Sequence, residues 1–226
     1  MQHELLKIVV FAINKNIPNY IQNRFFKCVN ASYKFLSIPI NVLGMHLNNN
    51  EPEDVFCKSR HLNWAIKQLI LKGEYNFIIQ TDIDVIPPPG IIEKSVEIVL
   101  SDKSKNTCYH VDHIRTDELM LPLLPEEYNS INWKHKEKLG KWEVSHGCWN
   151  AMLSDTWMKT DGWDERMIGW GKEDSAFRRS AIRKGIRFFD DREMSVIHVN
   201  HSQRTIDNRP RNAYIEENLP RQNWLI

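Results

Sequence analysis

An apolar, strand-forming run near the middle of the chain ends in two carboxylates. Residues 77–81 lead directly into Asp82 and Asp84, and the Pro-Pro-Pro-Gly segment at 87–90 prevents the strand from continuing. Such a buried strand places negative charge at the carboxyl edge of a sheet, where open α/β folds bind ligands. Two carboxylates so close together repel each other unless a cation or hydrogen bonds compensate them. A divalent metal holding a phosphate is the simplest explanation, although turns that favour Asp produce the same short pattern.

In the first half of the chain, apolar runs that predict strands alternate with segments whose apolar residues recur at helical spacing. The expected strands are 7–13, 38–43, 75–81 and 107–111, and the expected helices are 19–36, 56–72 and 91–100. The Asn-rich segment 48–54 is expected to be a loop. This alternation predicts an α/β sandwich with a largely parallel central sheet.

The second half has a less regular pattern. Segment 118–137 has no clean period and is expected to cover the sheet with loops. The pattern predicts a strand at 142–152, a helix at 172–184 closed by Gly185, and short strands at 186–189 and 194–199. The polar tail after Ser202 is expected to be mobile or to act as a lid. With 226 residues and neither repeats nor a linker, the chain is expected to form a single domain.

Composition excludes several classes of partner. A formal net charge of +1 provides no bulk attraction to nucleic acid or to an anionic membrane. No apolar stretch approaches the roughly 20 residues that a membrane span requires. The four cysteines lack C-x-x-C spacing, and the first residues lack the features of a signal peptide. We therefore expect reduced thiols and a cytoplasmic location.

A second acidic pair, Glu173 and Asp174, begins a predicted helix directly after Gly169-Trp170-Gly171. A helix N-terminus favours carboxylates, so capping alone explains one acidic residue. Capping does not explain an aromatic residue between two glycines, which allow the backbone to approach a ligand closely. A planar aromatic ring beside carboxylates is typical of sugar binding, so we favour a binding role for this segment.

His198 and His201 lie three residues apart at the end of the last predicted strand. Such a pair is often incidental, but neutral imidazoles bind Mn, Fe or Zn where the chain bends to bring them together. With Asp84, the two histidines would form a mixed oxygen and nitrogen site. That donor set suits Mn²⁺ or Mg²⁺ bridging two phosphates better than a closed structural zinc site.

The predicted helix at 56–72 begins with Lys58 and Arg60 and continues to Asn63. These residues have two interpretations. They form a solvated helical face, or they contact a nucleotide diphosphate or base.

Taken together and in this order, these segments resemble the β-1,4-galactosyltransferase family and its relatives among the GT-A glycosyltransferases, including chondroitin-polymerase-like members. Three motifs carry the resemblance: Phe56-x-Lys58-Ser59-Arg60-x-x-Asn63, Thr81-Asp82-Ile83-Asp84-x-Ile86-Pro87 and Gly169-Trp170-Gly171-x-Glu173-Asp174. The first is similar to a nucleotide-contacting segment of the family, with its two cations exchanged in identity. The resemblance implies a GT-A-type, Rossmann-like α/β/α sandwich over residues 1–201. Its nucleotide-binding half would span about 1–112, its acceptor half about 113–201, and 202–226 would be the tail.

The resemblance also implies roles for individual residues. Asp84 would bind the metal, and Asp82 would lie near the donor sugar or ribose. Asp174 would act as the general base, while Trp170, Gly171 and Glu173 would hold sugars. The family has a Met and a His where this chain has His198 and His201, and the second imidazole is a harder ligand that shifts the preference from Mn²⁺ towards Mg²⁺. Lys172 replaces the second glycine of a Trp-Gly-Gly run.

The function implied by the resemblance is metal-dependent, inverting transfer of a hexose or N-acetylhexosamine from a UDP-sugar to a hydroxyl acceptor such as a glycan. Two alternatives remain. In a haloacid-dehalogenase-like phosphatase, Asp82 and Asp84 would form the nucleophile motif, with Asp190 and Asp191 as the later acidic pair. That motif normally follows the first strand, whereas here it follows the third expected strand. The other alternative is a nucleotide-sugar binding module without turnover.

Overall fold

A computed structural model describes residues 6–14, 19–32, 40–46, 56–117, 128, 131–134, 140–144, 146–169, 171–200 and 209–218. Its strands are β1 (Ile8–Asn14), β2 (Ile40–His46), β3 (Phe77–Asp82), β4 (Val85–Ile86), β5 (Thr107–Asp117), β6 (Lys141–Glu143), β7 (Trp149–Leu153) and β8 (Arg187–Asn200). Its helices are α1 (Asn19–Ser32), α2 (Lys58–Leu71), α3 (Ile91–Ser101), α4 (Ser154–Lys159), α5 (Glu173–Arg183) and α6 (Arg209–Asn218).

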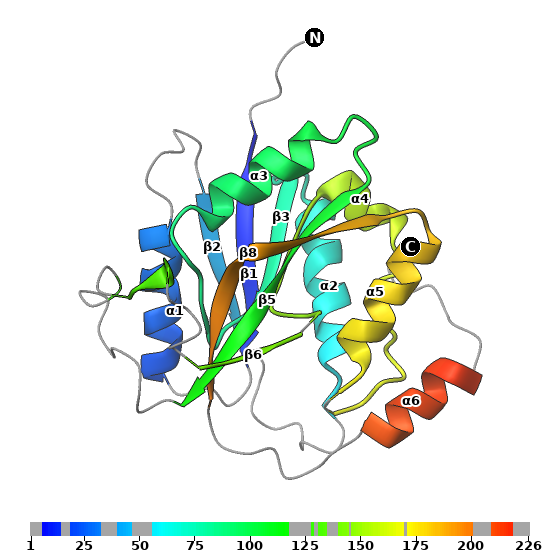
Figure 1. The fold of residues 1–226 in the computed structure, drawn as a ribbon. Helices are drawn as coiled ribbons and strands as arrows, with labels where there is room; N and C mark the ends of the chain where they lie inside the picture. Colours follow the sequence, from blue (N-terminus) through cyan, green and yellow to red (C-terminus); the bar gives the residue numbers. More distant parts are fainter. Residues whose placement is uncertain are drawn as a thin grey trace.

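The strands form one sheet in the order β2-β1-β3-β7-β5-β8-β4, with β6 paired to β5 (Figure 1). β1 is parallel to β2 and β3, and β5 is parallel to β8. β7 lies between these two groups and runs antiparallel to both β3 and β5. The five strands β1, β2, β3, β5 and β8 therefore share one direction. The predicted α/β sandwich with a mostly parallel sheet is confirmed.

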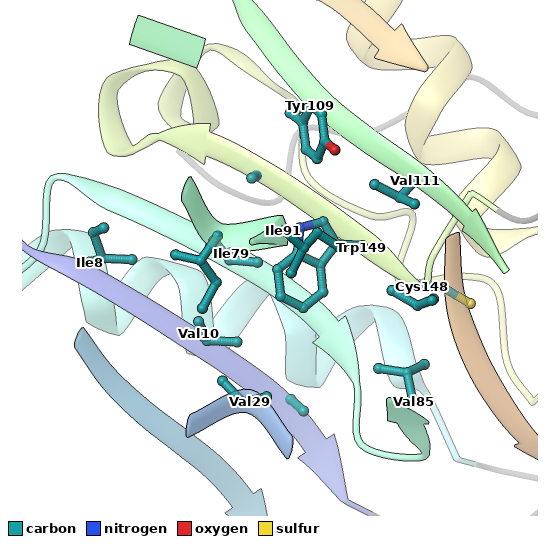
Figure 2. Packing of buried hydrophobic residues seen from close by; sticks show 14 of the residues in the cluster. Ile8, Val10, Val29, Ile79, Val85, Ile91, Tyr109, Val111, Cys148 and Trp149 are labelled. Atoms are coloured by element: carbon teal, nitrogen blue, oxygen red, sulfur yellow. The ribbon is translucent and has the colours of Figure 1, made fainter. Parts of the chain in front are cut away.

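Alternate residues of the central strands face two different hydrophobic layers, as the period of two in a β-strand requires. On one face, Val10 and Ile79 pack with residues of α1 and α3; Figure 2 shows part of this layer. On the other face, Val9 and Ile78 pack with residues of α2, α4 and α5. All four side chains are fully buried, and each such burial contributes roughly 1.5–3 kcal/mol. The central strands are covered on both faces, which is why they read as continuous apolar runs.

The single strand expected at 142–152 is wrong, because the chain forms β6 and β7 with a break at 144–148. The carbonyls of His146 and Gly147 in this break accept side-chain hydrogen bonds, from Asn150 Nδ2 (3.0 Å) and Gln80 Nε2 (3.1 Å), instead of ladder bonds. A Cβ atom at Gly147 would also clash with the Asp174 carboxylate unless that side chain moved.

The two short strands expected at 186–189 and 194–199 are in fact one strand, β8, with an irregular register. Val111 of β5 pairs with Asp191, but His113 pairs with Val196, so residue 112 of β5 faces residues 192–195 of β8. Asp191 stabilises the inserted segment, since its Oδ1 accepts the backbone N–H groups of Glu193 (2.8 Å) and Met194 (3.1 Å). Because the residues of this bulge are polar, they interrupt the apolar pattern of the sequence, and one continuous strand is predicted as two.

Three further elements were not expected as such. Val85 and Ile86 form the two-residue strand β4 before the prolines stop it, and α4 follows β7 directly. The tail, expected to be mobile or a lid, contains α6.

Gly185 has the left-handed backbone expected of it, with φ of +84°. The expected loop at 48–54 lies outside the described residues, as does most of 118–137.

Replacing Asp191 by alanine is expected to lower the free energy of unfolding by about 1–3 kcal/mol, because two backbone N–H groups and the Tyr109 hydroxyl lose their acceptor. Urea unfolding measures this loss. Asp190→Ala is the matched control, since it removes only a partly exposed pair with Arg178 and should cost less than about 1 kcal/mol. Equal losses in the two variants would contradict the assigned role of Asp191.

Candidate active site

The carboxyl end of β3 brings two carboxylates and an imidazole together. β4 runs antiparallel to β8, so Val85 pairs with His198, and the Val199 N–H donates to the Asp84 carbonyl at 2.9 Å. Nε2 of His198 lies 3.4 Å from Oδ2 of Asp84. One ligand atom each of Asp82, Asp84 and His198 lies within 4.8 Å of the others. Two carboxylate oxygens and one imidazole nitrogen form a donor set that suits Mn²⁺ or Mg²⁺.

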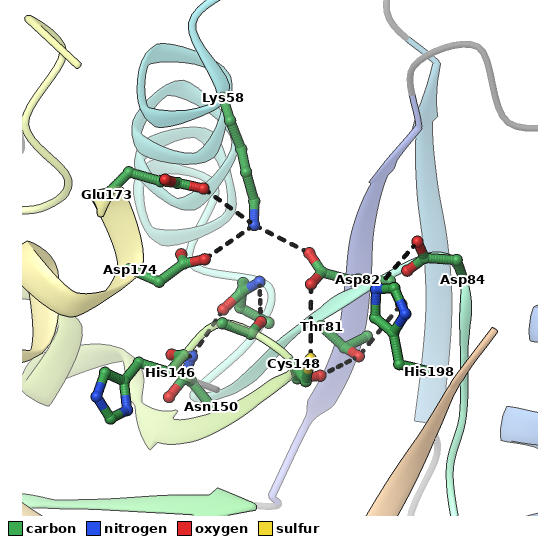
Figure 3. Close-up of polar contacts among 12 residues, drawn as sticks. Lys58, Thr81, Asp82, Asp84, His146, Cys148, Asn150, Glu173, Asp174 and His198 are labelled. Carbon is green, nitrogen blue, oxygen red and sulfur yellow. Dashed lines mark hydrogen bonds and ion pairs between the residues drawn. The ribbon is translucent and has the colours of Figure 1, made fainter. Parts of the chain in front are cut away.

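Lys58, the first residue of α2, lies at the centre of the site (Figure 3). Its Nζ is 3.1 Å from Asp82 Oδ1, 3.2 Å from Asp174 Oδ2 and 3.9 Å from Glu173 Oε1. The side chains of this group are between 6% and 24% exposed, so water screens their charges only partly. One ammonium group therefore compensates the carboxylates of two motifs that lie about ninety residues apart in the sequence.

The charges of this group act on one another strongly. Burial lowers the pKa of Lys58, but the three carboxylates around it raise the pKa by more, so it stands well above its usual value. Burial raises the pKa of Asp82, and Lys58 offsets this only in part because Asp84 and Asp174 add negative charge nearby. A second cation at this edge of the sheet would relieve the remaining repulsion among the carboxylates.

Glu173 and Asp174 occupy the first turn of α5. They complement the helix dipole, as capping predicts, but both also reach the Lys58 ammonium group. The preceding residue, Lys172, has φ of +73°, a left-handed conformation that costs a non-glycine residue roughly 1–2 kcal/mol. The backbone thus keeps a glycine-like turn in front of the acidic pair even though lysine occupies the position.

Cys148 and His113 also belong to this part of the structure, and sequence reasoning did not identify them. Sγ of Cys148 lies 3.8 Å from Asp82 Oδ2 and 3.4 Å from Nδ1 of His113. The His113 ring is 5.1 Å from the ring of His198. Burial, followed by the neighbouring His198, lowers the pKa of His113 to about 4, so this imidazole is neutral near pH 7. The register shift between β5 and β8 brings His113 here, and no local pattern signals it.

Two predicted binding residues contact the segment 163–165. The side chain of Asn63 is buried, and its Nδ2 donates to the Trp163 carbonyl (2.8 Å) and to Glu165 Oε1 (3.0 Å), while its Oδ1 accepts the Trp163 N–H at 2.8 Å. Arg60 is 57% exposed and lies 3.8 Å from a Glu165 oxygen. Both residues therefore contact this segment, and their nucleotide contacts stay predictions.

The loop before α5 packs against the C-terminal helix. Nδ2 of Asn212 in α6 donates to the carbonyls of Gly171 (2.8 Å) and Ile168 (3.3 Å), and Ile215 packs with Met167. Gly171 has φ of +103°, which favours glycine. Trp170 and His201 lie outside the described residues. The tail helix is therefore docked beside the predicted sugar-binding segment.

The second acidic pair of the phosphatase alternative has structural partners. Asp190 forms two hydrogen bonds of 2.7 Å with the guanidinium group of Arg178. Asp191 accepts from the Tyr109 hydroxyl and stabilises the bulge of β8. Both carboxylates of this pair therefore have partners within the fold.

No protein-family model matches the chain, and no curated protein matches its sequence. Solved structures match its fold. The catalytic domain of Drosophila β1,4-galactosyltransferase 7, in complex with xylobiose, aligns with a TM-score of 0.60 and 11% identity over 92% of this chain and 79% of that one. A mutant of the same enzyme with manganese, UDP-Gal and xylobiose aligns with a TM-score of 0.55 and 9% identity, over the same shares of the two chains.

GalNAc-T7 with UDP, GalNAc and Mn²⁺ aligns with a TM-score of 0.54 and 12% identity over 99% of this chain and 48% of that one. At such identities the likeness concerns the fold, and it confirms the predicted GT-A-type α/β architecture. No helix in the described part of the chain is long and apolar enough to span a membrane.

Lys58→Met is expected to lower the free energy of unfolding by about 1–3 kcal/mol, because three partly buried carboxylates lose their common cation. Lys94→Met is the control, since the ion pair of Lys94 is with Glu97, whose side chain is 67% exposed, and its loss should cost less than about 0.5 kcal/mol. Urea unfolding in a buffer with EDTA compares the two. A Lys58 variant as stable as the Lys94 variant would show that the ammonium group does not compensate these carboxylates.

Proposed function

We propose that the chain is a metal-dependent, inverting glycosyltransferase that moves a hexose or N-acetylhexosamine from a UDP-sugar to a hydroxyl acceptor. One observation carries the proposal: a group of three possible metal ligands at the end of β3 and an acidic helix N-terminus lie on either side of Lys58. The GT-A fold supports it, as do the UDP-Gal, UDP and manganese in the solved structures of similar fold. We also propose a subsite for a glycan acceptor, because the two galactosyltransferase structures of similar fold contain xylobiose.

Asp82, Asp84 and His198 would hold Mn²⁺, with Mg²⁺ as the alternative, and His201 would add a further nitrogen. When bound, the divalent cation supplies positive charge for the donor diphosphate and for the departing UDP. The donor atoms fit this use because they are two hard oxygens and one imidazole nitrogen close together. Lys58 would contribute a second positive charge on the side facing α5, and Arg60 and Asn63 would complete the nucleotide half of the domain.

Asp174 would act as the general base. The acceptor hydroxyl gives its proton to this carboxylate as its oxygen bonds to the anomeric carbon from the face opposite the diphosphate. The bond between that carbon and the diphosphate oxygen breaks, and its electron pair leaves with UDP. Glu173 would orient sugar hydroxyls beside the base, while Trp170 and Gly171 would line the sugar site and help to exclude water.

A nucleotide-sugar binding module without turnover would use the same metal and nucleotide contacts. The acidic pair at α5 favours catalysis over binding alone, because a carboxylate on a firmly held helix end is suited to accept a proton. Metal-dependent UDP release distinguishes the two functions.

The proposal is tested by thermal shift with UDP and UDP-sugars, with and without Mn²⁺, followed by measurement of UDP release. A ligand that binds only the native state raises the melting temperature, so UDP should stabilise the protein only when the metal is present. The ranking of UDP-sugars then indicates the donor. Stabilisation by none of the nucleotides would overturn the proposed function.

Two substitutions separate the metal site from the base. Asp84→Asn is expected to abolish the metal-dependent stabilisation by UDP, because one ligand loses its charge. Asp174→Asn should keep that stabilisation and lower the transfer rate by about 10²–10⁴-fold, the usual contribution of a general base. Asp190→Asn, which changes an acid paired with Arg178, should leave both readouts unchanged. Near-normal turnover of Asp174→Asn would refute the assignment of the base.

A further inference from the structure

The two oxygens of the Asp174 carboxylate have different partners. Oδ1 accepts a hydrogen bond of 3.0 Å from the indole Nε1–H of Trp163. Oδ2 accepts from the Lys58 ammonium group at 3.2 Å and lies against the backbone of Gly147. Lys58 divides its charge among three carboxylates on a flexible side chain, whereas an indole N–H points in one fixed direction.

Packing fixes the orientation of the Trp163 ring independently of Asp174. The ring is fully buried and stacks on Phe177 at a centroid distance of 4.0 Å with planes 10° apart. Trp157 stacks beside it at 5.6 Å. The Trp163 backbone is held as well, because the Asn63 side chain both accepts its N–H and donates to its carbonyl, each at 2.8 Å. A donor held in this way can orient the group that accepts from it.

We infer that Trp163 is a positioning residue for the general base. It holds Oδ1 of Asp174, so that Oδ2, on the side of Lys58 and Gly147, is the oxygen that takes the proton of the acceptor hydroxyl. This inference rests on the proposed function, because it assigns Trp163 a part in the same reaction. Asn63 then has an indirect role in the reaction. Its side-chain amide, which was expected to contact a nucleotide, holds the backbone of Trp163.

A purely structural role for Trp163 is the competing explanation, and one pair of variants distinguishes them. Trp163→Phe keeps an aromatic ring for the stack on Phe177 and deletes the N–H. Trp157→Phe is the matched control, because Trp157 belongs to the same stack, is equally buried, and donates its own N–H to the Ile78 carbonyl of β3 at 3.2 Å. Both variants lose one buried indole hydrogen bond, but only one of those bonds reaches Asp174.

The experiment measures kcat and KM for transfer from the best UDP-sugar, together with the thermal shift by UDP and Mn²⁺. Trp163→Phe should lower kcat by about 10-fold, since a displaced base is poorly aligned, while the donor KM changes by less than about 2-fold. Its stabilisation by UDP and Mn²⁺ should equal that of the wild type. Trp157→Phe should keep kcat within about 2-fold of the wild type. A kcat for Trp163→Phe that falls no further than that of Trp157→Phe overturns the inference.

Hydrogen exchange of the indole N–H groups tests the same contact in the wild-type protein. If Trp163 orients the base during the reaction, its N–H stays protected when UDP and Mg²⁺ are bound. If the N–H exchanges in that complex as fast as in Asp174→Ala, the contact is lost and the inference falls. Wild-type protein that releases no UDP from any donor overturns the proposed function together with the inference. If the wild-type protein is active and Trp163→Phe has the same kcat, the inference alone is overturned.

Discussion

The site depends on one interaction, the contact of the Lys58 ammonium group with the carboxylates of Asp82, Glu173 and Asp174. These carboxylates come from the end of β3 and the start of α5, and they would repel one another in a partly buried position without a shared cation. Lys58 begins α2, which packs on the same face of the sheet as α5. A single charge therefore joins three elements at the place where the edge of the sheet meets the acidic helix end.

The position of His198, a proposed metal ligand, depends on a second constraint, the bulge between β5 and β8. Four residues of β8 face one residue of β5, and after this insertion His198 pairs with Arg115 on one side and Val85 on the other. Because side chains alternate along a strand, a register shifted by one residue would turn the His198 side chain to the opposite face of the sheet. The hydrogen bonds that Asp191 accepts lie within this bulge, which precedes His198 in the strand.

The local motifs were the predictable part of the site. Asp82 and Asp84 follow an apolar run, Glu173 and Asp174 begin a helix after a glycine-rich turn, and His198 lies near the end of a strand. Each could therefore be identified from a few neighbouring residues of the sequence. Trp163, Cys148 and His113 were not visible in this way. Trp163 reads as an ordinary aromatic residue until the stack with Phe177 and the bond to Asp174 are known. His113 follows the irregular register of β5 and β8, and Gly147 lies against the Asp174 carboxylate, so neither contact could be read from neighbouring residues.

The sequence by itself determined the α/β class, the order of the principal elements and most of the charged side chains of the site. These properties follow from hydrophobic period, turn residues and short motifs, which act over a few neighbouring positions. Tertiary structure alone decided that β7 lies antiparallel between β3 and β5, that β8 is one bulged strand, and that Lys58 compensates both acidic motifs. It also decided that Asn63 holds the backbone of Trp163 and that Trp163 holds Asp174. These contacts join residues up to 116 positions apart, and packing of the two helical layers on one sheet selects them.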